Sequence, residues 1–310
     1  MTQRHLRKDQ EGFTLLEMLV TVGIMAAVAG TATLALQDTT ARASAAAHVL
    51  MMDELNEGIM TYRVLNGNAY PGNFDSMLED DDGAVGAGTA GYNRLAVSTG
   101  ALGSGSDLEL FPLTADMVTA LDDIGLGTMR YVDLSLDPPD AGDCADIQGL
   151  INNRGNAVVS GNIFLSPDAN GCGFSHTLVA TDTVLIWNGG NERVLGVGAG
   201  EFDDLTTIDA GDDVGAKIFM VVGAGPASGL FDASELGGMT SVPVYRHVGA
   251  DEYNRFFILF HIATVVDTDA DGTADAIEAV DQVNIGGVVD SAGDTKEEEL
   301  GEWDGTRNTI

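Results

Sequence analysis

An apolar run opens with the residues Glu11-Gly12-Phe13-Thr14-Leu15-Leu16-Glu17-Met18-Leu19-Val20 and continues to Leu36. Between Phe13 and Leu36, Glu17 is the only ionisable side chain. At 1.5 Å of rise per residue, this run predicts a helix of about 36 Å, long enough to cross the roughly 30 Å hydrocarbon layer of a bilayer. A carboxylate at that depth is costly, so Glu17 marks a functional position that needs a partner.

The polar segment 1–12 precedes the run and carries Arg4, Arg7 and Lys8. Positive charge on this side of an apolar helix predicts a cytoplasmic amino terminus and an exported body.

The motif Gly12-Phe13-Thr14-Leu15-Leu16-Glu17 resembles the class III signal of type IV prepilins and type II secretion pseudopilins. The resemblance implies that residues 1–12 are a leader, that prepilin peptidase cuts after Gly12, and that Phe13 becomes the methylated amino terminus. It also implies that Glu17 pairs with the Phe13 amine of a neighbouring subunit, which neutralises both charges and sets the register of a filament.

Two other interpretations of this segment stay open. An ordinary secretory signal would be cleaved after the apolar run, and Ala27-Val28-Ala29 is compatible with such a site. An uncleaved signal anchor is the second interpretation. Neither accounts for Gly12 and Glu17.

The helix is expected to extend well beyond the apolar run. No proline occurs between Phe13 and Tyr70, and an apolar stripe continues at spacings of three and four through Ala45, Val49, Met52, Leu55, Ile59 and Tyr62. The pattern predicts one helix over 13–66 that ends at Asn66-Gly67, with its first half in lipid and its second half against a globular body. The segment Tyr62 to Pro71, which spans the end of this helix, resembles the Tyr…Asn-Gly…Tyr-Pro exit of major pseudopilins and some bacterial pilins.

The rest of the chain predicts a β-rich globular domain over 67–290. Of the 310 residues, 40 are glycine and only 6% are aromatic, which indicates many turns. A short helix is expected from Thr114 to Ile124. Strands are expected at 157–165, 177–187, 216–222, 242–248, 255–266 and 282–289. The fold class is therefore α+β and pilin-like, with a long amino-terminal helix packed on a β-rich head, and residues 291–310 are expected to form an acidic, flexible tail.

The formal net charge is −34, and the only lysines are Lys8, Lys217 and Lys296. Such a surface repels nucleic acid and anionic lipid, so the body is not expected to bind nucleic acid. A proteome adapted to salt would explain the scarcity of lysine equally well.

An acidic loop near the carboxyl end fits the spacing of a twelve-residue calcium loop. Hard oxygen ligands are expected from the following residues: Asp267, Asp269, Asp271, the carbonyl of Thr273, Asp275 and Glu278. Gly272 permits the sharp turn. A strand-like run precedes the loop, so it resembles the isolated calcium loops of dockerins and thrombospondin repeats more than an EF-hand, and Ca²⁺ is the expected cofactor. A solvated acidic turn is the alternative.

Cys144 and Cys172 are the only two cysteines. In an exported chain an isolated pair predicts a disulfide, which would contribute about 3 kcal/mol by loop closure.

No motif predicts catalysis. The chain has no Gly-x-Ser-x-Gly or His-Glu-x-x-His pattern, and the glycines of 221–229 are better explained as turn residues than as a nucleotide-binding loop. We therefore predict a structural subunit of a type IV pilus-like or secretion pseudopilus filament. Its expected partners are copies of itself, other pilins, prepilin peptidase and the inner membrane. The alternative is a membrane-tethered or fibre-tip binding module with an acidic, calcium-binding head.

Overall fold

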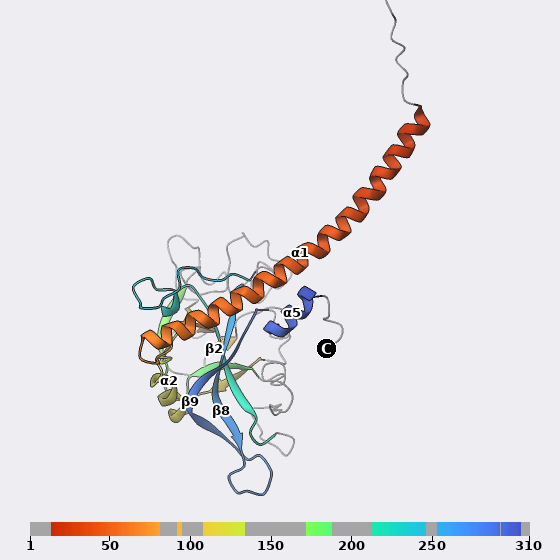
Figure 1. The fold of residues 1–310 in the computed structure, drawn as a ribbon. Coiled ribbons are helices and arrows are strands. Elements are labelled where there is room, and N and C mark those ends of the chain that lie inside the picture. Colours follow the sequence, from red (N-terminus) through yellow and green to blue (C-terminus); the bar gives the residue numbers. More distant parts are fainter. Residues whose placement is uncertain are drawn as a thin grey trace, which may run out of the picture.

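The structure is a computed structural model, and it describes residues 14–80, 92–94, 108–133, 172–187, 213–245, 253–291 and 293–304. A single long helix, α1 (Leu15–Leu65), projects from a head that is built on a mixed sheet (Figure 1). The predicted α+β class with a β-rich head is confirmed.

Helix α1 begins after the N-cap Thr14 and ends at the C-cap Asn66. From Ala45 onward, one face of the helix is buried against the head, and the face consists of the residues predicted from their spacing: Ala45, Val49, Met52, Leu55, Ile59 and Tyr62. At the other end of the helix, none of the segment Leu15–Thr33 is buried within the subunit, and this segment projects away from the head (Figure 1). One continuous helix therefore joins an exposed apolar segment to the core of the domain.

The described part of the chain contains a nine-stranded sheet. Its strands are β1 (Phe74–Asp80), β2 (Tyr92–Arg94), β3 (Leu108–Pro112), β4 (Thr128–Asp133), β5 (Gly173–Thr177), β6 (Thr183–Trp187), β7 (Lys217–Gly223), β8 (Phe257–Val266) and β9 (Ala276–Val289). The order along the sheet is β3-β6-β7-β1-β4-β5, with β2 on β1 and the β8–β9 hairpin on β7. The β1–β4 pair is parallel, and the other pairs in this part of the chain are antiparallel.

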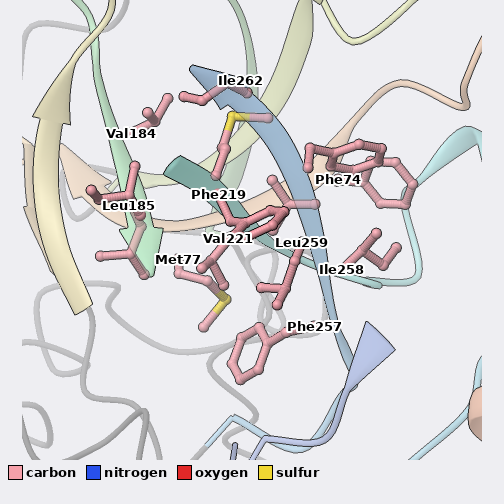
Figure 2. Packing of buried hydrophobic residues seen from close by; sticks show 14 of the residues in the cluster. Phe74, Met77, Val184, Leu185, Phe219, Val221, Phe257, Ile258, Leu259 and Ile262 are labelled. Carbon is pink, nitrogen blue, oxygen red and sulfur yellow. The ribbon is translucent and has the colours of Figure 1, made fainter. Parts of the chain in front are cut away.

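The centre of the core lies on β7 and β8. Both strands carry nearly unbroken runs of buried apolar residues, as expected for strands that are covered on both faces. In Figure 2, Phe219 and Val221 of β7 lie beside Ile258 and Leu259 of β8 within the same hydrophobic cluster. The prediction that 256–260 forms a buried central strand is confirmed for Phe257 onward.

Two shorter helical elements accompany the sheet. Helix α2 (Ala115–Asp122) has Thr114 as its N-cap, as predicted, and the Thr114 hydroxyl accepts a hydrogen bond from the backbone N–H of Met117. A single 3-10 turn, η2 (Gly229–Phe231), lies in the loop that follows β7.

The predicted strands agree with the structure in part. Strands β6 and β8 fall within predicted segments, β7 is shifted by one residue from the predicted 216–222, and β9 includes the predicted 282–289. Residues 242–245 form no strand, so that prediction is wrong for the described part of 242–248. The segment 157–165 lies outside the described residues.

The carboxyl end differs from the expected flexible tail. Residues Lys296–Asp304 form helix α5, which packs along α1 near the point where α1 leaves the head (Figure 1). Thr295 and Glu298 cap its first turn reciprocally through side-chain and backbone hydrogen bonds. Glu299 turns inward and is only 2% exposed, so a run of glutamates that suggested a solvated surface instead contributes a buried contact.

Candidate functional site

The exposed half of α1 is the first candidate site. Residues Leu15–Thr33 are long and apolar enough to cross a membrane by length and composition, and none of this segment is buried within the subunit. Large apolar side chains are exposed on all sides: Leu15, Leu16, Met18, Leu19, Val20, Val22, Ile24, Met25 and Val28. A soluble monomer rarely exposes so large an apolar surface, so this segment requires lipid or other chains around it.

The threonine hydroxyls of this segment are hydrogen-bonded to the backbone of the same helix. The hydroxyl of Thr21 donates to the carbonyl oxygens of Glu17 and Met18, at 2.9 Å each. Thr31 and Thr33 likewise donate to carbonyl oxygens one turn earlier. Because these hydroxyls need no water, the threonines are compatible with an apolar environment.

Glu17 closes the amino end of α1 through a capping box. Its Oε2 accepts hydrogen bonds from the backbone N–H and the hydroxyl of Thr14, both at 2.9 Å. In return, the Thr14 hydroxyl oxygen accepts a hydrogen bond from the backbone N–H of Glu17 at 3.3 Å. The predicted processing residues Gly12 and Phe13 lie outside the described residues.

The acidic loop is the second candidate site, and it joins β8 to β9 at the tip of a hairpin (Figure 1). Asp267 organises the loop, because its carboxylate accepts backbone N–H bonds from Ala270, Asp271 and Gly272 at 2.7, 3.3 and 2.7 Å. These bonds lower the pKa of Asp267 below its ordinary value and so favour the charged form. Gly272 has a φ of +92°, which glycine adopts without strain.

Three of the predicted ligands come together. Carboxylate oxygens of Asp267, Asp269 and Asp275 lie within 4.8 Å of one another. Two oxygens on one calcium ion are at most about 5 Å apart, because each lies about 2.4 Å from the metal. The donor set and its spacing therefore fit a calcium ion.

The other predicted ligands do not belong to this group. Asp271 instead accepts a hydrogen bond from the backbone N–H of Thr273 at 2.8 Å. Glu278 lies on β9, exposed to solvent and opposite Thr264 of β8. For Glu278 the reason is the strand that begins at Ala276, where an EF-hand would have a helix.

Cys172 is buried immediately before β5 and is not a free thiol. Cys144 lies outside the described residues, so the disulfide between the two stays a prediction.

The glycine-rich segment after β7 has a packing explanation. A Cβ on Gly223 would overlap the hydroxyl of Tyr253, and a Cβ on Gly225 would overlap the carboxylate of Asp75. Tyr253 donates a hydrogen bond to Asp75 at 2.8 Å, and both residues are fully buried. These glycines make room for a buried polar pair.

Sequence reasoning missed a group of buried polar residues between α1 and α5. His48, Asp290 and Glu299 are 3%, 0% and 2% exposed. The one signal in the sequence was the capping pattern Thr295-Lys296-Glu297-Glu298, which marks a helix start in a segment otherwise typical of a tail.

Comparison with known proteins adds one finding. Residues 7–33 match the family described as the prokaryotic N-terminal methylation motif. No curated protein and no solved structure matches the chain. With its capped apolar helix and its glutamate in the first turn, the segment 7–33 is the prokaryotic N-terminal methylation motif, the signal of type IV pilin and pseudopilin precursors.

Proposed function

We propose that this protein is a subunit of a type IV pilus-like or type II secretion pseudopilus filament, processed after Gly12 and assembled through α1. The observation that carries the proposal is one continuous helix whose first half is apolar and exposed while its second half is part of the core of the head. Such a helix holds a precursor in a membrane and can later pack against identical helices. No enzymatic activity is proposed.

Burial of apolar surface would hold the precursor in the membrane, and close packing of helices would then drive assembly. Fully burying one leucine or valine side chain stabilises by about 1.5–3 kcal/mol, and Leu15–Thr33 exposes nine large ones. In the membrane those side chains already contact lipid, so the gain on assembly comes from close helix packing and from pairing of polar groups. Glu17 is the polar group available for that role.

Glu17 is placed to bind an amine without losing its cap. Both of its hydrogen bonds to Thr14 use Oε2, so Oε1 remains a site for the Phe13 amine of a neighbouring subunit. Pairing would neutralise two charges in an apolar interior and would fix the axial position of each subunit.

The proposed location changes with assembly. The precursor would lie in the inner membrane with its amino terminus in the cytoplasm, where prepilin peptidase removes residues 1–12. The mature subunit would then join copies of itself and other pilins in a periplasmic or extracellular filament, with the head on the outside.

Calcium binding by the β8–β9 loop is the second part of the proposal. Asp267, Asp269 and Asp275 would supply oxygen ligands, and the ion would offset repulsion among carboxylates that lie within 4.8 Å. In a head with this much negative charge, the ion would stabilise the hairpin.

Substitution of the cleavage residue tests the filament role. Gly12→Ala should leave a membrane-retained precursor, and sheared-fibre preparations should lack the protein. Gly229→Ala in the head is the control, because a Cβ at this position has its nearest neighbours 3.6 Å away, and it should be processed and assembled normally. Normal fibres from Gly12→Ala would contradict the proposal. A protein that is processed but is rare in wild-type fibres would instead favour the fibre-tip binding module.

A further inference from the structure

A groove of about 340 Å³ lies between helix α1 and strand β9. One wall is formed by four residues of α1: Met52, Asp53, Asn56 and Met60. The other wall is formed by residues 285–289 of β9. Residues 295–297, where α5 begins, also line the groove, and there Lys296 forms an ion pair with Asp53. The groove therefore lies at the junction of three elements that are far apart in the sequence.

The groove follows the edge of β9. Successive side chains of a strand point to opposite faces, so a surface that touches all five residues from 285 to 289 lies along the backbone and not over one face. In the part of the chain that the structure describes, β9 pairs only with β8. A strand with one partner directs every second N–H and C=O away from that partner, and this edge can pair with a further strand.

The dimensions fit one extended strand. Helix α1 rises about 12 Å between Met52 and Met60, and residues 285–289 extend over about 13 Å, so the two walls have the same length. A guest of four or five residues would pair along this edge. Because α1 forms the opposite wall, the groove admits a single strand and not the edge of a second sheet.

The charges of the walls favour a guest with positive charge. Asp53 and Glu297 both line the groove and are exposed. Lys296 is the one cationic residue in the lining, and it is paired with Asp53. Since the whole chain has a formal net charge of −34, an acidic guest would be repelled. Met52 and Met60 add adaptable apolar surface.

The six residues that follow α5 have the required chemistry. The sequence Gly305-Thr306-Arg307-Asn308-Thr309-Ile310 has one cationic and no acidic side chain. Three of these residues are β-branched, which favours an extended strand. They lie outside the described residues. When extended, six residues span up to about 20 Å, which is enough to cover the groove.

The reach of this segment favours the groove of a second copy. Helix α5 begins at the groove, but its residues after Glu297 do not line it, so the helix leads away. Its nine residues extend over about 13 Å. Residues 305–310 of the same copy would use most of their length to return, whereas a neighbouring copy can present them directly.

We propose that residues 305–310 of one copy add a strand to the edge of β9 in the groove of a second copy. Backbone hydrogen bonds with β9 would supply the affinity, and Arg307 would face the carboxylates of Asp53 and Glu297. The contact joins two different surfaces, so it can repeat from copy to copy along a fibre. The inference rests on the proposed filament, which brings the copies together.

Binding of a labelled peptide tests the groove without fibres. The full chain is kept in detergent micelles, and a fluorescent peptide of residues 305–310 is titrated by polarisation. Consecutive N–H groups of a strand point to opposite sides, so one of the peptides Asn308→Pro and Thr309→Pro should bind at least about tenfold more weakly and the other almost normally. No saturable binding of the unaltered peptide up to about 1 mM, or equal binding of all three, would overturn the proposal.

The charge of the guest is tested with the same assay. The peptide Arg307→Gln should bind about threefold more weakly at low salt, and the difference should disappear in about 1 M NaCl, where surface charges are screened. Equal affinity at low salt would remove the charge complementarity that selects this segment and would contradict the proposal.

A matched pair of variants places the peptide in the groove. Asn56→Trp fills the groove with a bulky side chain and should weaken peptide binding at least about tenfold. The control Glu57→Trp alters the next residue of α1, which is exposed and outside the lining, and it should bind normally. Circular dichroism checks that both variants remain folded. Equal affinity in the two variants would place the peptide elsewhere and overturn the proposal.

Cross-linking in fibres tests the contact between copies. Cells produce two differently tagged chains, one with Asn56→Cys and the other with Thr309→Cys, and mild oxidation of sheared fibres should join the two tags. Each variant mixed with the wild type is the control. Fibres without this cross-link, or with a cross-link from Asn56→Cys to a different protein, would overturn the inference and leave the filament role intact. If the wild type forms no fibres, the filament role fails, and the peptide titration still decides whether the groove binds this segment.

Discussion

The Glu17 carboxylate lies 2.9 Å from both the backbone nitrogen and the hydroxyl oxygen of Thr14, so the residue proposed to bind a neighbouring subunit already caps its own helix. The cap holds the carboxylate at the amino end of α1, in the first turn of the helix. Because the cap uses Oε2 alone, Glu17 can cap α1 through Oε2 and bind the amine of a neighbouring subunit through Oε1.

Replacing Glu17 with Gln should separate processing from assembly. The variant should be cleaved normally, but its fibre yield should fall more than about tenfold, because an amine left unpaired in an apolar interior costs about 3–5 kcal/mol. Fibre yield is measured by shearing and immunoblotting. Thr21→Val is the control, since Thr21 bonds only to its own helix, and it should assemble normally. Unaltered assembly of Glu17→Gln would remove the pairing mechanism.

Calcium binding should depend on the three clustered aspartates. Asp267→Asn and Asp269→Asn should each weaken binding at least about tenfold, because each removes a charged oxygen ligand from the site. Titration calorimetry with CaCl₂ gives the affinities. Asp281→Asn, an exposed carboxylate on β9 outside the loop, should have little effect. Equal affinity in all the variants would show that the loop is only a solvated turn.

Gly225 should tolerate no side chain. Gly225→Ala would push against the buried Asp75 carboxylate and should destabilise the head by about 1–3 kcal/mol. Chemical denaturation measures the free energy of unfolding. Gly229→Ala is a matched control in the same loop, because its nearest neighbours lie 3.6 Å away, and it should unfold at nearly the wild-type denaturant concentration.

Filament formation should depend on ionic strength. A subunit with a formal net charge of −34 repels its neighbours, and at 0.15 M salt the Debye length is about 8 Å. Fibre yield should therefore rise from about 0.01 M to 1 M NaCl as the heads are screened. A yield that falls with salt would mean that attractive ion pairs between heads outweigh the repulsion.

The sequence predicted well those features that depend on local periodicity. The stripe from Ala45 to Tyr62, the stop at Asn66 and the Thr114 cap all depend on residues within a few turns of each other, and all are confirmed. Strands β7 and β8 were predictable because their long apolar runs allow few other structures.

The features that were missed depend on contacts between distant residues. Strand β1 contains Asp75, Ser76, Glu79 and Asp80 and does not have the composition of a strand, yet Asp75 is buried because Tyr253 donates to it from a distance of 178 residues in the sequence. Likewise, Glu299 belongs to a run of glutamates and is buried only because His48 and Asp290 lie beside it. In the acidic loop, the spacing indicated six candidate ligands, and the hairpin brings the carboxylates of three of them, Asp267, Asp269 and Asp275, close together.

Processing after Gly12 is tested by the intact mass and the amino-terminal sequence of the exported protein. Processing after Gly12 predicts a chain that starts at N-methylated Phe13, with the mass of residues 13–310 plus one methyl group. A chain that starts near Gly30, or one that retains Met1, would contradict processing at Gly12 and with it the assignment of α1 as an assembly helix.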